Sequence, residues 1–297
     1  MSIDCRGKRG GRRAPARERV VVRVPASTSN FGPGFDCLGV ALRLYNDITV
    51  SRLGALTKNA MAVEAATLFF GETGVASFPF ACSIKGDVPQ SRGLGSSVTV
   101  RLGVLLALNR LAGEPIERDD LFQLCAKLEG HPDNAAPAAY GGFTVARANA
   151  VQRFEVNSRL KFVLLIPNFE VSTARARSVL PKRIDRIEAV SCVGNACAIT
   201  AAFASGVYEN LADSFRDFLH QPFRTELNPH LRDIIAAGES AGALGGFLSG
   251  SGSTVACVTL KKANAVASAM QSAASSRNAA VLVTTADNGG ARVLKTR

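Results

Sequence analysis

The chain contains no tryptophan, and histidine, tyrosine and methionine each occur only three times among its 297 residues. The three histidines, His131, His220 and His230, leave little room for a metal site built from imidazole ligands. The seven cysteines are scattered, odd in number and free of any CxxC pair. This pattern favours reduced thiols in a cytoplasm over a disulfide framework or a zinc site.

Long hydrophobic runs are also missing. No stretch approaches the roughly 20 apolar residues of a membrane span, and the N-terminus lacks the apolar core of a signal peptide. At 47% hydrophobic and 20% charged residues, the chain has the composition of a globular protein with a large core. We therefore expect a cytoplasmic protein of two lobes, without a membrane partner.

Acidic residues are scarce at the N-terminus. The first 19 residues hold seven Lys or Arg and two acids, which gives +5 of the net charge of +11. Residues 1–18 show no apolar period, so we expect a disordered basic arm. A solvated tail is favoured; a transit peptide or an arm that contacts nucleic acid are the alternatives.

From residue 19 onward, strand and helix patterns are mixed without a strict βαβ rhythm, which predicts an α+β fold. A strand is expected from Arg19 to Val24 and should end at Pro25. Residues 52–80 are ambiguous, although 60–74 have helical length and a glycine stop. Helices are expected over 96–113 and 117–130, where each pattern meets a glycine. The segment 188–240 has a helical pattern, and "AAVLVTTA" is expected to form the closing strand.

The stretch "GDVPQSRGLGSSVTV" (residues 86–100) combines a glycine-rich turn, two serines and the start of a buried helix. Glycines allow a close approach of backbone N–H groups, and a helix N-terminus attracts anions. The Walker pattern fails because no lysine follows Gly95, and GxGxxG fails because Val98 takes the place of its last glycine. The residues leave two interpretations open: a phosphate-binding loop, or a serine-capped helix after a tight turn.

Several motifs in one order favour the first interpretation. "PQSRGLGSS" resembles the signature of the GHMP kinase superfamily, and its neighbours resemble the homoserine kinase family within it. These neighbours cover residues 20–290 and are "VPASTSNFGPGFDCLGVAL", "EGHPDNAAPAAYGGF", "VSTARARSVLP", "HQPFR" and "LSGSGSTVAC". The sequence departs from the family pattern at Val98, where alanine is usual, and at Ser253, where proline is usual.

The resemblance implies a two-lobed GHMP kinase fold, with an ATP-binding lobe over 19–155 and a ferredoxin-like lobe over 156–297. It also implies phosphorylation of the side-chain hydroxyl of L-homoserine by ATP and Mg²⁺, in a homodimer. Two rivals stay open: another small-molecule kinase of this fold, and a non-catalytic protein that binds nucleotide or nucleic acid. The basic arm is the support for the last, and we expect no nucleic-acid partner.

The resemblance also assigns residues. Those implied at the ATP phosphates are Pro89, Gly93, Leu94, Gly95, Ser96 and Ser97. Ser97 and Glu129 are the implied Mg²⁺ ligands, since a hard cation prefers oxygen. Those implied at the substrate are Asn30, Asp36, Asp133, Thr173, Arg177, Arg224 and Gly252.

Roles within this set differ. Arg177 and Arg224 are implied to hold the substrate carboxylate, which suits the planar fork of arginine. Asp36 and Asp133 are the catalytic candidates, with Asp133 either a proton acceptor or a positioning group. Helix capping, turn chemistry and ordinary surface charge are the plain alternatives for these residues, and His131 could be purely structural.

Overall fold

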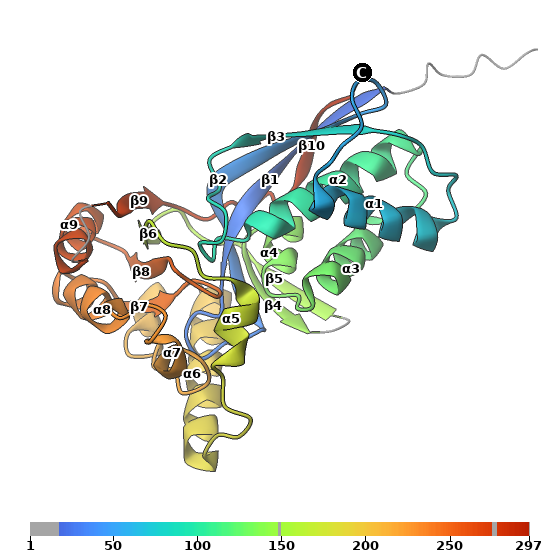
Figure 1. Cartoon of the computed structure of the whole chain (residues 1–297). Helices are drawn as coiled ribbons and strands as arrows, with labels where there is room; N and C mark the ends of the chain where they lie inside the picture. Colours follow the sequence, from blue (N-terminus) through green and yellow to red (C-terminus); the bar gives the residue numbers. More distant parts are fainter. Residues whose placement is uncertain (1–17, 148–149, 275–277, 297) are drawn as a thin grey trace, which may run out of the picture.

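The computed structural model describes residues 18–147, 150–274 and 278–296, and it has two antiparallel sheets with helices packed on them (Figure 1). The predicted α+β class is confirmed. The basic arm falls almost entirely outside the described residues.

The first sheet has the strand order β10-β1-β2-β4-β5, and β3 pairs with the far end of β2. All of its pairs are antiparallel. Its strands are β1 (Arg19–Ser29), β2 (Leu38–Ser51), β3 (Ala81–Gly86), β4 (Phe143–Arg147), β5 (Ala150–Phe154) and β10 (Arg292–Thr296).

Four helices pack with this sheet: α1 (Ala60–Thr73), α2 (Ser96–Leu111), α3 (Arg118–Glu129) and α4 (Ala135–Tyr140). Helix α2 contacts β1, β2 and the other three helices, which explains why its sequence is apolar nearly all round. The predicted glycine stops are confirmed for α1 and α3, since Gly74 and Gly130 take left-handed conformations at the two helix ends. The helix that begins inside the GLGSS stretch is therefore anchored in the core from Val98 onward.

The second sheet has the order β7-β8-β6-β9, formed by β6 (Lys161–Ile166), β7 (Gly245–Leu248), β8 (Val255–Thr259) and β9 (Ala280–Thr284). Helices α8 (Leu231–Ser240) and α9 (Ala263–Ala273) contact it. This order, with one helical connection before β7 and one before β9, is the ferredoxin-like arrangement. The connection from β6 to β7 holds α5 (Thr173–Ser178), α6 (Arg186–Ser205), η1 (Tyr208–Leu211) and α7 (Gln221–Arg224).

Phe31 joins the two sheets. Its ring lies in the β1–β2 connection, and it stacks on Phe247 of β7 with 4.5 Å between centroids. The same ring meets the edges of Phe143 in β4 and Phe162 in β6 at 5.8 and 6.4 Å. Because this aromatic cluster is fully buried, the loops that flank Phe31 are held between the sheets.

Two expectations about strands were wrong. Strand β1 continues through Pro25 to Ser29, because its pairing with β10 ends at Arg23 and its register with β2 shifts after Pro25. The Pro25 nitrogen, which carries no hydrogen, therefore does not have to donate a hydrogen bond to a neighbouring strand. The strand after 278 is also not the last one, because the chain returns to the first sheet as β10.

Helix α6 stands apart. Among the described residues it has the length and apolar composition of a membrane span. Its Ile199, Ala202 and Phe203 are nevertheless buried in the core between the sheets. Figure 1 shows the helix projecting from the lower side of the view.

Candidate active site

A cavity of about 290 Å³ lies among the loops that connect the sheets. It is lined by most of the predicted site residues, namely Asn30, Asp36, Gly93, Gly95, Ser96, Ser97, Glu129, Asp133, Thr173, Arg177 and Arg224. The fold thus brings together residues that span almost 200 positions of sequence.

Three predicted residues do not line the cavity. Leu94 is fully buried in the core, and its carbonyl accepts a hydrogen bond from the Ser27 amide at 3.2 Å. Pro89 lies before the turn, and Gly252 lies behind the loop whose Gly250 reaches the cavity. The ATP role of Pro89 and Leu94 and the substrate role of Gly252 stay predictions.

The GLGSS turn leads directly into α2. Gly93 and Gly95 have φ of 71° and 68°, a region in which glycine is favoured. Gly95 is the N-cap residue, and no side chain caps the helix. The serine-capping alternative is therefore wrong. The N–H groups of the first turn lack intrahelical partners, and Ser96, Ser97 and Val98 of that turn line the cavity.

The GLGSS turn contacts the loop that follows β7 of the second sheet. The Ser249 hydroxyl donates to the Gly93 carbonyl at 2.6 Å, and a Cβ added at Gly93 would collide with the Ser249 carbonyl. Thr28 of β1 shares a 2.8 Å hydrogen bond with Ser249 as well. Glycine at 93 is thus required both by its conformation and by the close approach of the two loops.

Ser97 and Glu129 form one cluster of oxygens at the start of α2. The Ser97 hydroxyl donates to Glu129 Oε2 at 2.8 Å. Arg101 holds Oε1 of the same carboxylate at 2.7 Å and also pairs with Glu64 at 2.9 Å. One hydroxyl and one carboxylate beside a phosphate loop are a donor set that suits Mg²⁺.

Asp36 and Arg177 form an ion pair at the other end of the cavity. The two guanidinium nitrogens donate to the two carboxylate oxygens at 2.7 and 3.1 Å. Phe35 lies between Arg177 and Arg224, with the guanidinium carbons 5.4 and 5.3 Å from its ring centroid. Sequence reasoning did not select Phe35, although it stands beside Asp36 in the quoted "FGPGFD".

Arg224 is 2% exposed. Its Nε donates to the Ala176 carbonyl at 3.0 Å and its Nη1 to the Gly250 carbonyl at 2.9 Å. Burial, and then the charge of Arg177, lower the pKa of Arg224 to about 10. Burial also lowers the pKa of the neighbouring His220 to about 4, so His220 is neutral at physiological pH. Within the described chain no carboxylate forms an ion pair with Arg224.

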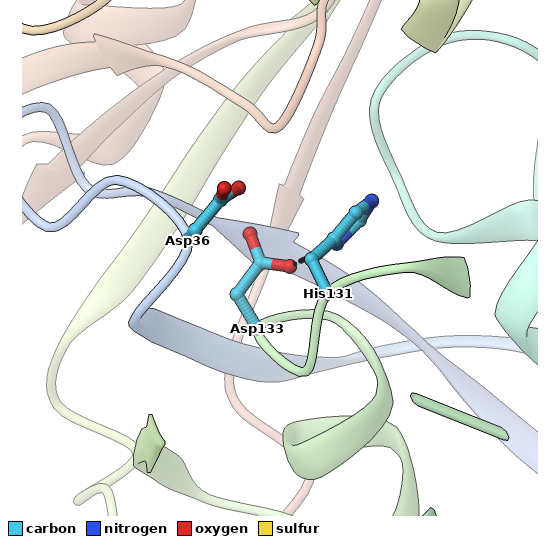
Figure 2. A group of neighbouring side chains, drawn as sticks. All are labelled: Asp36, His131 and Asp133. Carbon is cyan, nitrogen blue, oxygen red and sulfur yellow. Dashed lines mark hydrogen bonds and ion pairs between the residues drawn. The ribbon is translucent and has the colours of Figure 1, made fainter. Parts of the chain in front are cut away.

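His131 and Asp133 lie beside Asp36 (Figure 2), with His131 Nδ1 and Asp133 Oδ1 2.5 Å apart. Burial lowers the pKa of His131, but the hydrogen bond and charge of Asp133 outweigh burial and raise it overall. Burial likewise raises the pKa of Asp133, and the hydrogen bond and charge of His131 outweigh it, so that pKa is lowered. The two groups stabilise each other as an ion pair.

The same three side chains could in principle hold a cation, since their ligand atoms lie within 4.8 Å of one another. Arg177 already occupies both oxygens of Asp36, however, and Asp133 Oδ1 accepts from the Asn134 amide as well as facing His131. The residues of this cluster are thus engaged with one another and with Arg177.

A polar network beside the cavity joins the predicted Asn30 and Asp36 with three residues that the sequence did not single out, Ser27, Ser29 and Asn134. Asn134 accepts from the Ser27 hydroxyl at 2.9 Å and donates to the Ser29 hydroxyl at 2.8 Å. Asn30 donates to the Gly250 carbonyl at 2.9 Å and accepts from the Asp36 amide at 3.1 Å. The alternation of serines 27 and 29 on β1 was the available signal.

The two departures from the family pattern have structural roles. Val98 is buried in the core of the first lobe. The Ser253 hydroxyl donates to the Phe169 carbonyl at 2.6 Å, and its own carbonyl accepts from Asn228 at 2.9 Å. Neither residue replaces a polar group of the cavity.

Comparison with known proteins agrees with this architecture. Residues 60–142 match the N-terminal domain of GHMP kinases, and residues 199–276 match their C-terminal domain. A homoserine kinase of Clostridium botulinum is 35% identical over 93% of this chain and 99% of its own length. A homoserine kinase of Caldicellulosiruptor saccharolyticus is 39% identical over 80% of this chain and 82% of its own length. The crystal structure of homoserine kinase from Cytophaga hutchinsonii has a TM-score of 0.84 and 26% identity, covering 96% of this chain and all of that one.

Proposed function

Because the chain belongs to the homoserine kinases of the GHMP kinase family, we propose that it phosphorylates the side-chain hydroxyl of L-homoserine with ATP. The product is O-phospho-L-homoserine, which feeds threonine synthesis. The cavity supports this reaction because it is polar at both ends and lies beside a helix N-terminus.

The observation that best supports an amino-acid substrate is the buried guanidinium of Arg224. A buried cation without a carboxylate partner favours an anionic ligand, and Arg177 lies close enough to lower its pKa. Asp36 lies next to Arg177 and supplies the opposite charge. A ligand that places a carboxylate at the two arginines and an ammonium at Asp36 has the groups of an α-amino acid.

We assign the nucleotide phosphates to the GLGSS turn. Ser96 and Ser97 line the cavity at the uncapped start of α2, where the partial positive charge of the helix and its free N–H groups attract phosphate oxygens. The turn keeps this position through the hydrogen bond between Ser249 and Gly93. Pre-set donors of this kind lower the cost of the charge that develops in phosphoryl transfer.

We assign Mg²⁺ to Ser97 and Glu129. When bound, the ion would supply positive charge that neutralises the phosphates during transfer. Glu129 has one oxygen on Arg101 and the other on Ser97, so Arg101 fixes the orientation of the carboxylate. Arg101 is accordingly a positioning residue.

In the transfer step, the substrate oxygen forms a bond to the γ-phosphorus while the bond from that phosphorus to the bridging oxygen of ADP breaks. The lowered pKa of Asp133 makes it a weak proton acceptor. We propose that it orients the hydroxyl, and that the proton passes to an oxygen of the transferred group. Positioning and charge neutralisation then supply most of the rate.

The test is release of ADP with ATP, Mg²⁺ and L-homoserine, compared with L-serine, L-threonine, shikimate and mevalonate. We expect release with homoserine. Arg224→Met should lower kcat/KM by about a hundredfold through loss of a buried charged contact, while Arg175→Met, on the exposed side of α5, should change it little. Release of ADP with another alcohol would identify that alcohol as the substrate instead. No release of ADP with any of them overturns the proposal.

We also propose a cytoplasmic location and a homodimer as the working form. The scattered, odd number of cysteines supports the first. The second rests on the resemblance to the homoserine kinase family.

A further inference from the structure

His220 is a fully buried side chain that connects two elements of the cavity wall. On one side its Nε2 lies 2.9 Å from the carbonyl oxygen of Gly32, in the β1–β2 connection that also carries Asp36. On the other side its Nδ1 lies 3.2 Å from Nη1 of Arg224 in α7. The imidazole therefore joins the loop that carries the proposed ammonium contact to the helix that carries the proposed carboxylate contact.

The two partners fix which nitrogen of His220 carries the proton. A carbonyl oxygen only accepts hydrogen bonds, so Nε2 must be the protonated nitrogen that donates to Gly32. A guanidinium only donates, so Nδ1 must be unprotonated and accept from Arg224. Because burial lowers the pKa of His220 to about 4, the ring stays in this neutral form at physiological pH. The imidazole is thus a neutral acceptor for a buried cation.

Asp217 does not change this assignment. Its Oδ2 lies 3.4 Å from Nε2 of His220, so it faces the same protonated nitrogen as the Gly32 carbonyl. The carboxylate also accepts from the backbone amides of Leu219, His220 and Gln221 at 2.7, 3.1 and 2.7 Å. These bonds anchor the start of α7 and hold the backbone of His220 in place.

Phe35 fixes the plane of the imidazole. Its ring stacks on His220 with 5.2 Å between centroids and 28° between the planes. The same phenyl ring lies 5.3 Å from the guanidinium carbon of Arg224. Rotation of the imidazole would therefore disrupt the stacking and both hydrogen bonds of the ring together.

The hydrogen bonds of Arg224 show why this acceptor matters. Nε donates to the Ala176 carbonyl, and one N–H of Nη1 donates to the Gly250 carbonyl. The second N–H of Nη1 is the one that His220 accepts. Among the described residues, His220 is the one side chain that accepts from this guanidinium, and none accepts from Nη2. Because Arg224 lines the cavity, the two N–H groups of Nη2 are left for a ligand.

We propose that His220 is a positioning residue for the substrate and acts through Arg224. Its unprotonated Nδ1 orients the guanidinium so that Nη2 meets the carboxylate of the entering amino acid. Its bond to Gly32 keeps that contact at a set distance from Asp36. The inference rests on the function proposed above, since that substrate supplies the carboxylate.

The test uses three variants of His220 that separate its two hydrogen bonds. His220→Asn can place an amide oxygen near the position of Nδ1, which keeps an acceptor for Arg224. His220→Gln can place an amide nitrogen near the position of Nε2, which keeps the donor to Gly32. His220→Phe removes both hydrogen bonds and keeps a ring beside Phe35.

The measurement is the rate of ADP release at varied concentrations of L-homoserine and of ATP. We expect the KM for homoserine to rise about tenfold or more in His220→Gln and His220→Phe, because a buried cationic N–H loses its acceptor. In His220→Asn the rise should be about threefold or less. The kcat and the KM for ATP should stay within about threefold in all three variants, because the carboxylate contact is the same before and during transfer.

A second measurement separates this role from a structural one. In the Arg224→Met background, His220→Phe should change kcat/KM by less than about twofold, because the group through which it acts is absent. His230→Phe is the matched control, since His230 is exposed. It should leave every kinetic constant unchanged.

The outcomes separate the inference from the proposed function. No release of ADP by the unmodified chain with any amino acid overturns the proposed function and this inference with it. Release with an unchanged KM for homoserine in His220→Gln and His220→Phe overturns the inference alone. So does recovery in His220→Gln in place of His220→Asn, or a full further loss in the Arg224→Met background. If His220→Phe loses its circular dichroism signal, the comparison of His220→Asn with His220→Gln decides.

Discussion

At the scale of single residues, the pairing of His131 with Asp133 shows how burial and charge oppose each other. Both side chains are largely buried, which by itself disfavours their charged forms. The close contact reverses that preference in both, raising one pKa and lowering the other. The pair is therefore most stabilising when both groups are charged.

This pair predicts a pH dependence of stability. The contribution of His131 is fully present below the unfolded pKa, about 6.5, and is lost as pH rises through its raised folded pKa. The contribution of Asp133 is present above about pH 4 and is lost as pH falls through its lowered pKa. The melting temperature of His131→Gln should fall further below that of the unmodified chain at pH 6 than at pH 9, measured by circular dichroism.

His230→Gln is the control for this experiment, since His230 is exposed. Its difference from the unmodified chain should vary little with pH. A difference for His131→Gln that grows toward pH 9 would contradict the ion pair.

Most of the site residues predicted from the sequence do line the cavity, because their motifs are short and each contains the chemistry itself. It did not reveal how they pair. That Arg224 lacks an acidic partner while Arg177 has one depends on where "HQPFR" and "VSTARAR" meet in space. The supporting serines 27 and 29 were inside a quoted motif, but the strand was expected to end at Pro25, so their places along β1 were not foreseen.

At the scale of elements, the start of α2 depends on a turn that only glycine fits. Gly93→Ala should weaken ATP binding about tenfold or more, since it strains a positive φ and pushes the loop away from Ser249. Binding of ATP measured by calorimetry tests this directly. Gly71→Ala in α1, where an added Cβ meets nothing within 4 Å, should leave binding unchanged and gain stability of about 0.5–1 kcal/mol.

Equal weakening of ATP binding in Gly93→Ala and Gly71→Ala would indicate a general loss of folding and would contradict a specific role for the GLGSS turn.

Helix ends marked by a glycine were predictable, as α1 and α3 show. Strand ends were not. Pro25 is tolerated because one neighbour of β1 ends just before it, which is a property of the sheet and not of the local sequence. Strand β10 is short and half exposed, so its residues gave little periodic signal.

At the scale of the whole molecule, Asp287 ties the last turn to the first sheet. It accepts from the Tyr45 hydroxyl at 2.7 Å and from the Gly289 and Gly290 amides, both at 2.8 Å. Asp287→Ala should lower the free energy of unfolding by about 2–3 kcal/mol, because three donors, of which the Gly290 amide is buried, lose their acceptor. Urea unfolding followed by circular dichroism measures it, as the chain has no tryptophan.

The exposed Glu226 provides the comparison, and Glu226→Ala should change the free energy by less than about 0.5 kcal/mol. Similar small losses of unfolding free energy in both variants would mean that Asp287 does not hold the last turn against the first sheet.

The ion pair between Asp36 and Arg177 has a consequence for which molecules the cavity admits. In the proposed complex, each partner gives up the other and takes an opposite charge from the ligand, so the entering molecule must carry both signs. A zwitterion completes this exchange. A simple hydroxy acid would engage Arg177 and leave Asp36 beside it without a cation, which is costly in a partly buried site. If the proposed roles hold, such acids should bind more weakly than a zwitterion.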